Sequence, residues 1–417
     1  MAQQPATHEG ESPSVLRTSA AAVALALGGM LGAGVFVGVG AASAAAGGLA
    51  LLGLPLAVLA AVCCAVSSAE SSESYRGPGA AYGCVRARLG IVPARIAASS
   101  HFVGYAALIA ALAGAIGEYA VPGGSLGISL AVPFVVVLAA TTGLRLRGTA
   151  AWLWLLGTCT VLGLVVVTCL AISPPERTPG VDVEPLGIVA AAGTLFVVFL
   201  GFERLTAPDD ESQRFPRVTI RRGLIVSLVA ATMITAVVAV ALLRQFGGAR
   251  LGLAPAPLRD VLAAAGAQGL EPWVGVGAAL VMLPVLLGAV ETLRSTALAV
   301  VRDRDLPAGL AKTGSHGTPW LLDMLGAAAA GALTALLDPA AALALGACCV
   351  LVHYAFANAG VRILLAEDRT WPQRTACLGM ALCVVLAVSM PVPALTGAAG
   401  AAVLGPLVGG LVSRRWS

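Results

Sequence analysis

The chain has 417 residues, of which 58% are apolar and only 11% are charged, and its mean hydropathy is +0.92. Soluble proteins average roughly 25% charged residues, so this composition argues against a soluble domain and predicts an all-α membrane protein. The net charge of +4 comes without the interleaved aromatic and basic residues of a nucleic-acid surface, so no nucleic-acid partner is expected.

A polar N-terminal tail at residues 1–17 precedes a series of long apolar segments. Crossing a bilayer in helical form takes about 20 such residues, and by this measure the sequence predicts about 12 transmembrane helices. The expected spans are residues 18–46, 48–69, 94–120, 126–142, 151–172, 187–207, 224–243, 274–293, 319–337, 340–364, 376–390 and 392–412.

The basic residues predict the orientation of these spans. With the N-terminus placed inside, all of the 25 Lys and Arg residues fall on the inner side except Arg177, Arg244, Arg250 and Arg259. Inner loops are the ones that collect positive charge. The bias therefore predicts a multi-pass protein of the plasma (inner) membrane, with an even number of spans and both termini cytoplasmic.

Catalytic and metal-binding motifs are not found in the sequence. The nine cysteines lie mostly inside apolar runs without a C-x-x-C pair, and neither H-E-x-x-H nor G-x-S-x-G occurs. Free cysteine packs as a small hydrophobe, whereas a metal site needs clustered ligands. We therefore expect no enzyme activity, no metal and no cofactor.

Glycines interrupt the first span at its middle, between Gly28 and Gly38. Each costs about 1 kcal/mol in a helix relative to Ala, so the cluster predicts a broken helix, with tight helix packing as the alternative. Five spans later, Gly201 and Glu203 fall near the inner end of the sixth span. Paired interruptions at matching places indicate the binding site of an inverted-repeat transporter. The alternative for Glu203 is an ion pair with Arg204 or Arg222.

Five motifs in chain order resemble the amino acid-polyamine-organocation (APC) superfamily. They are residues 30–36 (MLGAGVF), 79–82 (GAAY), 199–203 (FLGFE), 301–307 (VRDRDLP) and 354–358 (YAFAN). The resemblance runs from about residue 18 to residue 365. It implies a 5+5 inverted repeat (leucine-transporter-like), with residues 18–173 and 187–365 as the two repeats and helices 1 and 6 discontinuous. Residues 366–417 would add two C-terminal helices and a cytoplasmic end.

The resemblance also implies a secondary active transporter of amino acids that works by alternating access. Backbone N–H groups of the unwound first helix suit a carboxylate, and unwound carbonyls of the sixth suit an ammonium group. The mostly apolar pocket candidates favour a neutral amino acid. Alternatives are an amino acid or amine exchanger and an amino acid sensor on a transporter scaffold. Nothing in the sequence indicates an oligomeric state.

The expected substrate-binding residues are Met30, Leu31, Gly32, Ala33, Gly34, Phe196, Val197, Val198, Phe199 and Gly201. Phe199 stands where the family places an aromatic side chain that covers the substrate, and ordinary packing is the alternative.

Three further residues are candidates for ion coupling, which we expect to use protons, with sodium as the other option. Glu291 is either a protonation site or an ion-pair partner of Arg294, three residues away on the same helix face. His101 has an ordinary pKa near 6.5, but a packed histidine is the alternative. Thr158 matches the family position where some members carry a lysine; its hydroxyl could instead help to bind sodium.

Overall fold

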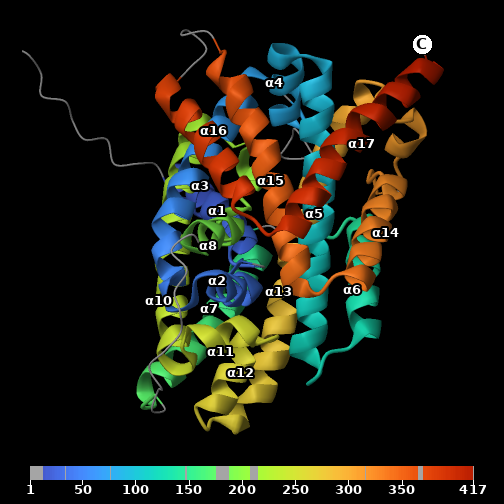
Figure 1. The fold of residues 1–417 in the computed structure, drawn as a ribbon. Helices are drawn as coiled ribbons and strands as arrows, with labels where there is room; N and C mark the ends of the chain where they lie inside the picture. Colours follow the sequence, from blue (N-terminus) through green and yellow to red (C-terminus); the bar gives the residue numbers. More distant parts are fainter. Residues whose placement is uncertain are drawn as a thin grey trace, which may run out of the picture.

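The computed structural model describes residues 13–32, 34–75, 77–145, 148–174, 187–206, 215–314, 316–364 and 370–416. These residues form helices joined by short turns, and the described ranges contain no strand (Figure 1). The helices that fall on the expected spans are α1 (Pro13–Met30), α2 (Val39–Ala46), α3 (Leu54–Ser74), α5 (Ile91–Ala120), α6 (Leu126–Thr141), α7 (Thr149–Ala171), α8 (Gly187–Leu195), α10 (Arg217–Phe246), α13 (Glu271–Arg302), α14 (Trp320–Leu336), α15 (Pro339–Arg362), α16 (Gln373–Val388) and α17 (Val392–Trp416).

Seven helical segments in the described ranges are long and apolar enough to cross a membrane, and four shorter apolar helices accompany them. The chain is thus a multi-pass membrane protein, while the count of twelve spans stays a prediction. Short helices also form in segments where the sequence analysis expected no span: α4 (Ala80–Leu89), α11 (Gly248–Leu253) and α12 (Pro257–Ala264).

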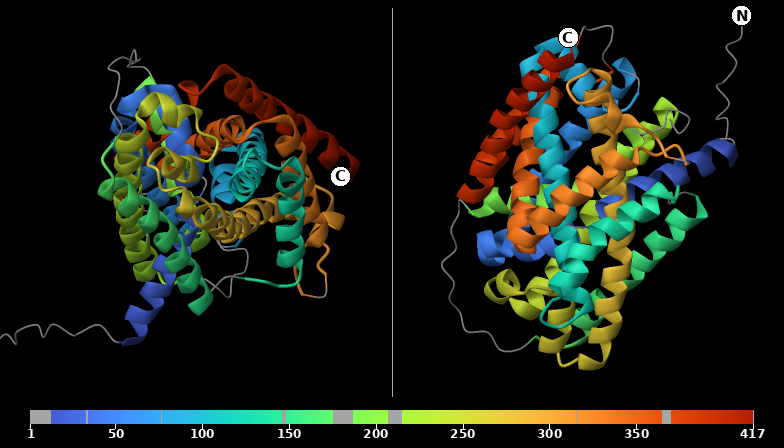
Figure 2. Two further views of the ribbon diagram at one scale, coloured as in Figure 1. Left: turned by 90° about the horizontal axis from the view of Figure 1, so that it is seen from below. Right: turned by 90° about the vertical axis from the view of Figure 1, so that its right-hand side faces the viewer.

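Helix α5 runs through the centre of the bundle and packs against α13 and α15 (Figures 1 and 2). Small residues allow this close approach. A Cβ atom at Gly104 would lie 2.8 Å from Cγ2 of Val350, and one at Gly346 would lie 2.8 Å from the Leu108 side chain. Apolar helices in lipid gain by such contact because van der Waals packing, rather than the hydrophobic effect, holds them together.

Short helices lie at both ends of the bundle, and ion pairs join the helices at one of them. Helix α4 lies at one end, together with the end of α17, and α11 and α12 lie at the other (Figure 1). At the α4 end, Arg86 contacts Asp303 at 3.0 Å and Asp305 at 2.6 Å, and Arg95 contacts Asp305 at 2.6 Å. These ion pairs tie α4 and α5 to the turn that follows α13.

A buried ion pair joins α13 to α14. Nε of Arg294 donates to Oδ1 of Asp323 at 2.8 Å, and Nη2 donates to Oδ2 at 2.7 Å. Both residues are only 2% exposed. A two-pronged contact of this kind fixes the relative rotation of the two helices, and removal of one partner would leave an uncompensated buried charge.

Candidate functional site

The first long apolar segment is interrupted in its middle. Helix α1 ends at Met30, and a π-helical turn, η1 (Gly34–Gly38), leads into α2. The N–H groups of Val35 and Phe36 both donate to the carbonyl of Gly32, at 2.9 and 3.1 Å. The hydrogen-bond ladder of a regular α-helix is therefore broken just after α1, where the sequence places its glycines.

A second interruption follows α8. A 3₁₀ turn, η3 (Phe196–Phe199), leads to an extended Leu200, and helix α9 (Glu203–Thr206) begins after Gly201. Gly201 has a φ of +133°, which L-residues with a Cβ atom rarely adopt. The glycine thus permits the turn of the chain between η3 and α9.

The two interruptions lie against each other through main-chain atoms. A Cβ atom at Gly29 would lie 3.1 Å from Cα of Gly201, and one at Gly201 would lie 2.8 Å from the carbonyl carbon of Gly29. A Cβ atom at Gly34 would fall closer than 3.0 Å to the main chain of Val198. We call this contact of α1 and η1 with η3 and α9 the glycine crossing. It explains why glycine occupies these positions.

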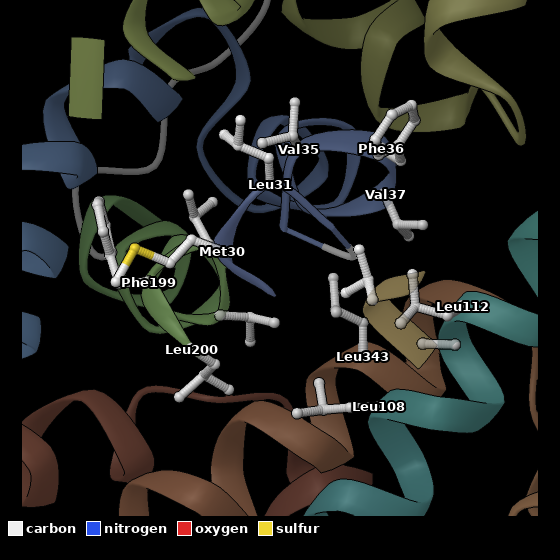
Figure 3. Packing of buried hydrophobic residues seen from close by; sticks show 14 of the residues in the cluster. Met30, Leu31, Val35, Phe36, Val37, Leu108, Leu112, Phe199, Leu200 and Leu343 are labelled. Carbon is white, nitrogen blue, oxygen red and sulfur yellow. The ribbon is translucent and has the colours of Figure 1, made fainter. Parts of the chain in front are cut away.

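A small cavity of about 40 Å³ borders the crossing. Its walls come from α1, α5, the η3–α9 region and α13. They comprise Gly29, Tyr105, Leu108, Leu112, Val197, Leu200, Gly201, Arg204, Val285, Gly288, Ala289 and Thr292. Figure 3 shows hydrophobic side chains from the first interrupted segment, from α5, from η3 and from α15 converging on this part of the core. Val285 presses on the unwound chain so closely that a Cβ atom at Gly32 would collide with it.

The structure brings the expected substrate-binding residues together at the crossing. Met30, Leu31, Phe196, Val198 and Phe199 are at most 1% exposed. Val197 and Gly201 line the small cavity, whereas Phe199 lies in η3 outside its walls. Ala33 falls outside the described residues. The roles of these residues toward a substrate stay predictions.

Glu203, at the start of α9, accepts hydrogen bonds from the hydroxyl groups of Tyr105 on α5 and Tyr354 on α15. The alternative considered for Glu203, an ion pair with Arg204 or Arg222, does not form. Sequence reasoning missed Tyr105 altogether. Its signal was a polar aromatic residue one helical turn after His101, in a helix that is otherwise rich in Ala.

Arg204 pairs with Glu291 and not with Glu203. Its Nη2 atom donates to Oε2 of Glu291 at 3.1 Å, and this ion pair joins α9 to α13 beside the small cavity. The predicted pairing of Glu291 with Arg294 is wrong, because Arg294 points toward Asp323 on α14. Residues three apart on a helix diverge by about 60°, enough to face different neighbours.

His101 lies between the tyrosine pair and a second histidine. The centre of its ring lies 4.6 Å from that of Tyr105 and 4.6 Å from that of His353, and its Nε2 atom lies 3.4 Å from Oγ1 of Thr296. Nδ1 of His101 is buried without a hydrogen-bond partner among the described residues. Nδ1 of His353 lies 2.9 Å from the carbonyl oxygen of Ala97. The imidazole rings therefore extend the polar cluster around Glu203.

Thr158 is the third coupling candidate, on α7, and its hydroxyl donates to the carbonyl of Trp154 at 3.0 Å. That bond stays within its own helix. Among the described residues, no group of three or more His, Cys, Asp or Glu side chains could hold a metal ion. Sodium binding through Thr158 stays untested.

Comparison with known proteins fits this architecture. Residues 19–408 match the family model described as amino acid permease. The chain is 36% identical over 394 residues to an uncharacterized transporter of Mycobacterium tuberculosis, covering 92% of this chain and 88% of that protein. It is 25% identical to the branched-chain amino acid permease of Bacillus subtilis (71% of this chain, 69% of that protein) and 25% identical to a methylthioribose transporter of the same organism (78% and 76%). The chain therefore belongs to the amino acid permease family of the APC superfamily.

Proposed function

We propose that this chain is a secondary active transporter that moves neutral amino acids across the plasma membrane by alternating access. The observation that carries the proposal is the glycine crossing, where two interrupted helices meet through their main chains. In the proposed topology these are transmembrane helices 1 and 6 of a 5+5 inverted repeat, formed by residues 18–173 and 187–365. Both termini are cytoplasmic.

The crossing is suited to bind both the carboxylate and the ammonium group of an amino acid. The start of η1 and α2 places the positive end of a helix at the crossing, which suits a carboxylate. The carbonyls at the end of α8 and in η3 suit an ammonium group. Leu108, Leu112 and Val285 give the cavity walls a mostly apolar surface for the substrate side chain. A neutral, apolar amino acid fits these walls, in keeping with the printed substrate of the branched-chain relative.

The described conformation is closed around the site. A cavity of about 40 Å³ holds a water molecule but not an amino acid, since ligand pockets span about 300–1,000 Å³. The Arg204–Glu291 ion pair joins α9 to α13 beside this cavity. We infer that an inward-open state requires this pair to separate, so that α9 swings away from α13.

Glu203 is our first choice for the proton-carrying group. It is buried and held by two neutral hydroxyl groups, without a cationic partner among the described residues. An ionised carboxylate in such a place is costly, so protonation and the state of the site should be linked. Glu291 is less suited because it already forms an ion pair with Arg204. His101 is the second choice, as the neighbour of Tyr105.

Uptake into proteoliposomes tests this proposal. A panel of radiolabelled amino acids, with methylthioribose included, is offered with and without an inward pH gradient. Accumulation of neutral amino acids driven by the gradient supports proton symport. If substrate accumulates only when the liposomes are preloaded with it, the protein is an exchanger. If verified, folded protein binds an amino acid but moves nothing, the sensor alternative holds.

The Glu203→Gln variant tests the coupling group. It should keep exchange of preloaded substrate but lose accumulation driven by the pH gradient, because the amide cannot carry the proton. Glu118→Gln, which changes a carboxylate at the far end of α5, serves as the matched control and should behave as the unaltered protein. If gradient-driven uptake survives in Glu203→Gln, a group other than Glu203 carries the proton.

A further inference from the structure

A long groove runs along the outside of the bundle between α3 and α10. Its volume is about 510 Å³. Apolar side chains line most of it, including Val58 and Val62 of α3 and Leu228, Val229 and Met233 of α10. Val229 is 56% exposed and Met233 is 60% exposed, so the groove opens toward the surroundings of the bundle.

One end of this groove is polar and basic. Arg217 and Arg221, in the first turns of α10, line it together with Glu73 and Trp371. Arg217 is largely exposed and touches Glu73 at 3.3 Å. The guanidinium carbon of Arg221 lies 5.0 Å from the centre of the Trp371 ring. Arg217 is thus paired with an acid, whereas Arg221 stacks on an aromatic ring and has no carboxylate partner among the described residues.

The tryptophan at this end is held in place. Oε1 of Glu70 accepts hydrogen bonds from the main-chain N–H groups of Thr370 and Trp371, at 2.8 and 2.7 Å. Tryptophan and arginine both favour the boundary between lipid tails and water. The polar end of the groove therefore has the composition of a membrane interface, and the apolar remainder has that of the hydrocarbon layer.

We propose that this groove binds a phospholipid with an anionic headgroup, its phosphate at Arg217 and Arg221 and one acyl chain along α10. The length of the groove fits one leaflet. Arg221 and Met233 are separated by about 18 Å along the helix axis, and half of the hydrocarbon core is about 15 Å thick. Basic pockets between helices on the cytoplasmic side are suited to anionic headgroups.

A second groove of the same volume, about 510 Å³, provides an internal comparison. It lies among α5, α13, α14, α15 and α17 and is also lined mostly by apolar side chains. Its basic residue, Arg95, is already paired with Asp305 at 2.6 Å. This groove therefore has no counterpart of Arg221, and it should not distinguish anionic from zwitterionic lipids.

Native mass spectrometry of the purified protein tests the proposal. The protein is mixed with equal amounts of phosphatidylglycerol and phosphatidylcholine that carry the same acyl chains. The unaltered protein should retain one phosphatidylglycerol preferentially. The double variant R217Q/R221Q should bind it about 30-fold more weakly, with its affinity for phosphatidylcholine unchanged. V229W, which fills the groove, should lower the retention of both lipids.

The control variant R302Q/K312Q removes the same charge from exposed residues outside the groove and should keep the preference for phosphatidylglycerol. Equal retention of phosphatidylglycerol by R217Q/R221Q and the unaltered protein would overturn the proposal. So would undiminished retention by V229W, since the acyl chain would then lie elsewhere. Displacement of the lipid by an equal concentration of glycerol phosphate would mean that the site recognises a soluble phosphate instead.

Discussion

Replacement of Gly34 by alanine is expected to destabilise the protein and abolish uptake. The added Cβ atom would fall closer than 3.0 Å to the main chain of Val198, so η1 and η3 would have to separate. Overpacking of this kind costs about 1–3 kcal/mol. Gly28→Ala is the matched control in the same segment, because nothing lies within 4 Å of its added atom. That change should gain up to about 1 kcal/mol of helix propensity, so the two variants should differ by about 2–4 kcal/mol.

Two measurements follow from this difference. Thermal unfolding of both variants in one detergent should place Gly34→Ala below the unaltered protein and Gly28→Ala at or above it, and uptake into proteoliposomes should survive only in Gly28→Ala. An additional Val198→Ala change should not rescue Gly34→Ala, because the collision involves main-chain atoms. If Gly34→Ala unfolds and transports like Gly28→Ala, the close contact at the glycine crossing does not exist.

Three further changes probe other contacts. Gly32→Ala should impair uptake, and Val285→Ala should restore much of it, because the added atom meets mainly the Cγ methyl groups of Val285, which alanine lacks; failure of the rescue would contradict that packing. Asp323→Asn should lower the free energy of unfolding by about 3–5 kcal/mol, and the double change with Arg294→Met should recover part of that loss in the same unfolding assay. Despite burial, which opposes the shift, neighbouring guanidinium groups lower the pKa of Asp305, outside the spans, below 3.8. The stability that the ionised Asp305 contributes should therefore be complete above pH 3.8 and should fade as pH falls through the lowered pKa. If Asp305→Asn loses the same stability in acid as the unaltered protein, this reasoning is refuted.

The interruptions at the glycine crossing could be predicted from the sequence because their cause is local. Glycines in the middle of an apolar run cost helix stability wherever they occur, so Gly32 and Gly34 signal a break without knowledge of the neighbours. The same holds for Gly201, whose φ of +133° is one that residues with side chains avoid. Ala33 lies between two of these glycines but outside the described residues.

The partners of the charged residues could not be predicted in the same way, because they depend on helix packing. Spacing suggested that Glu291 pairs with Arg294, yet Glu291 meets Arg204, 87 positions away in the chain. Arg294 meets Asp323 on another helix. Long side chains reach whichever neighbour the rotation of their helix offers, and that rotation is set by contacts distant in sequence. The tyrosine pair around Glu203 was missed for the same reason.

The glycine crossing also bears on how such proteins diverge. The contact is made by main-chain atoms, which do not depend on the side chain present. Most residues around the crossing can therefore be substituted without changing the contact. Only the few positions that must lack a Cβ atom are constrained by its geometry. Variation that alters the shape of the site is then left to the facing helices α5 and α13, through side chains such as Leu108, Leu112 and Val285. A change of substrate is therefore compatible with an unchanged main-chain contact at the glycine crossing.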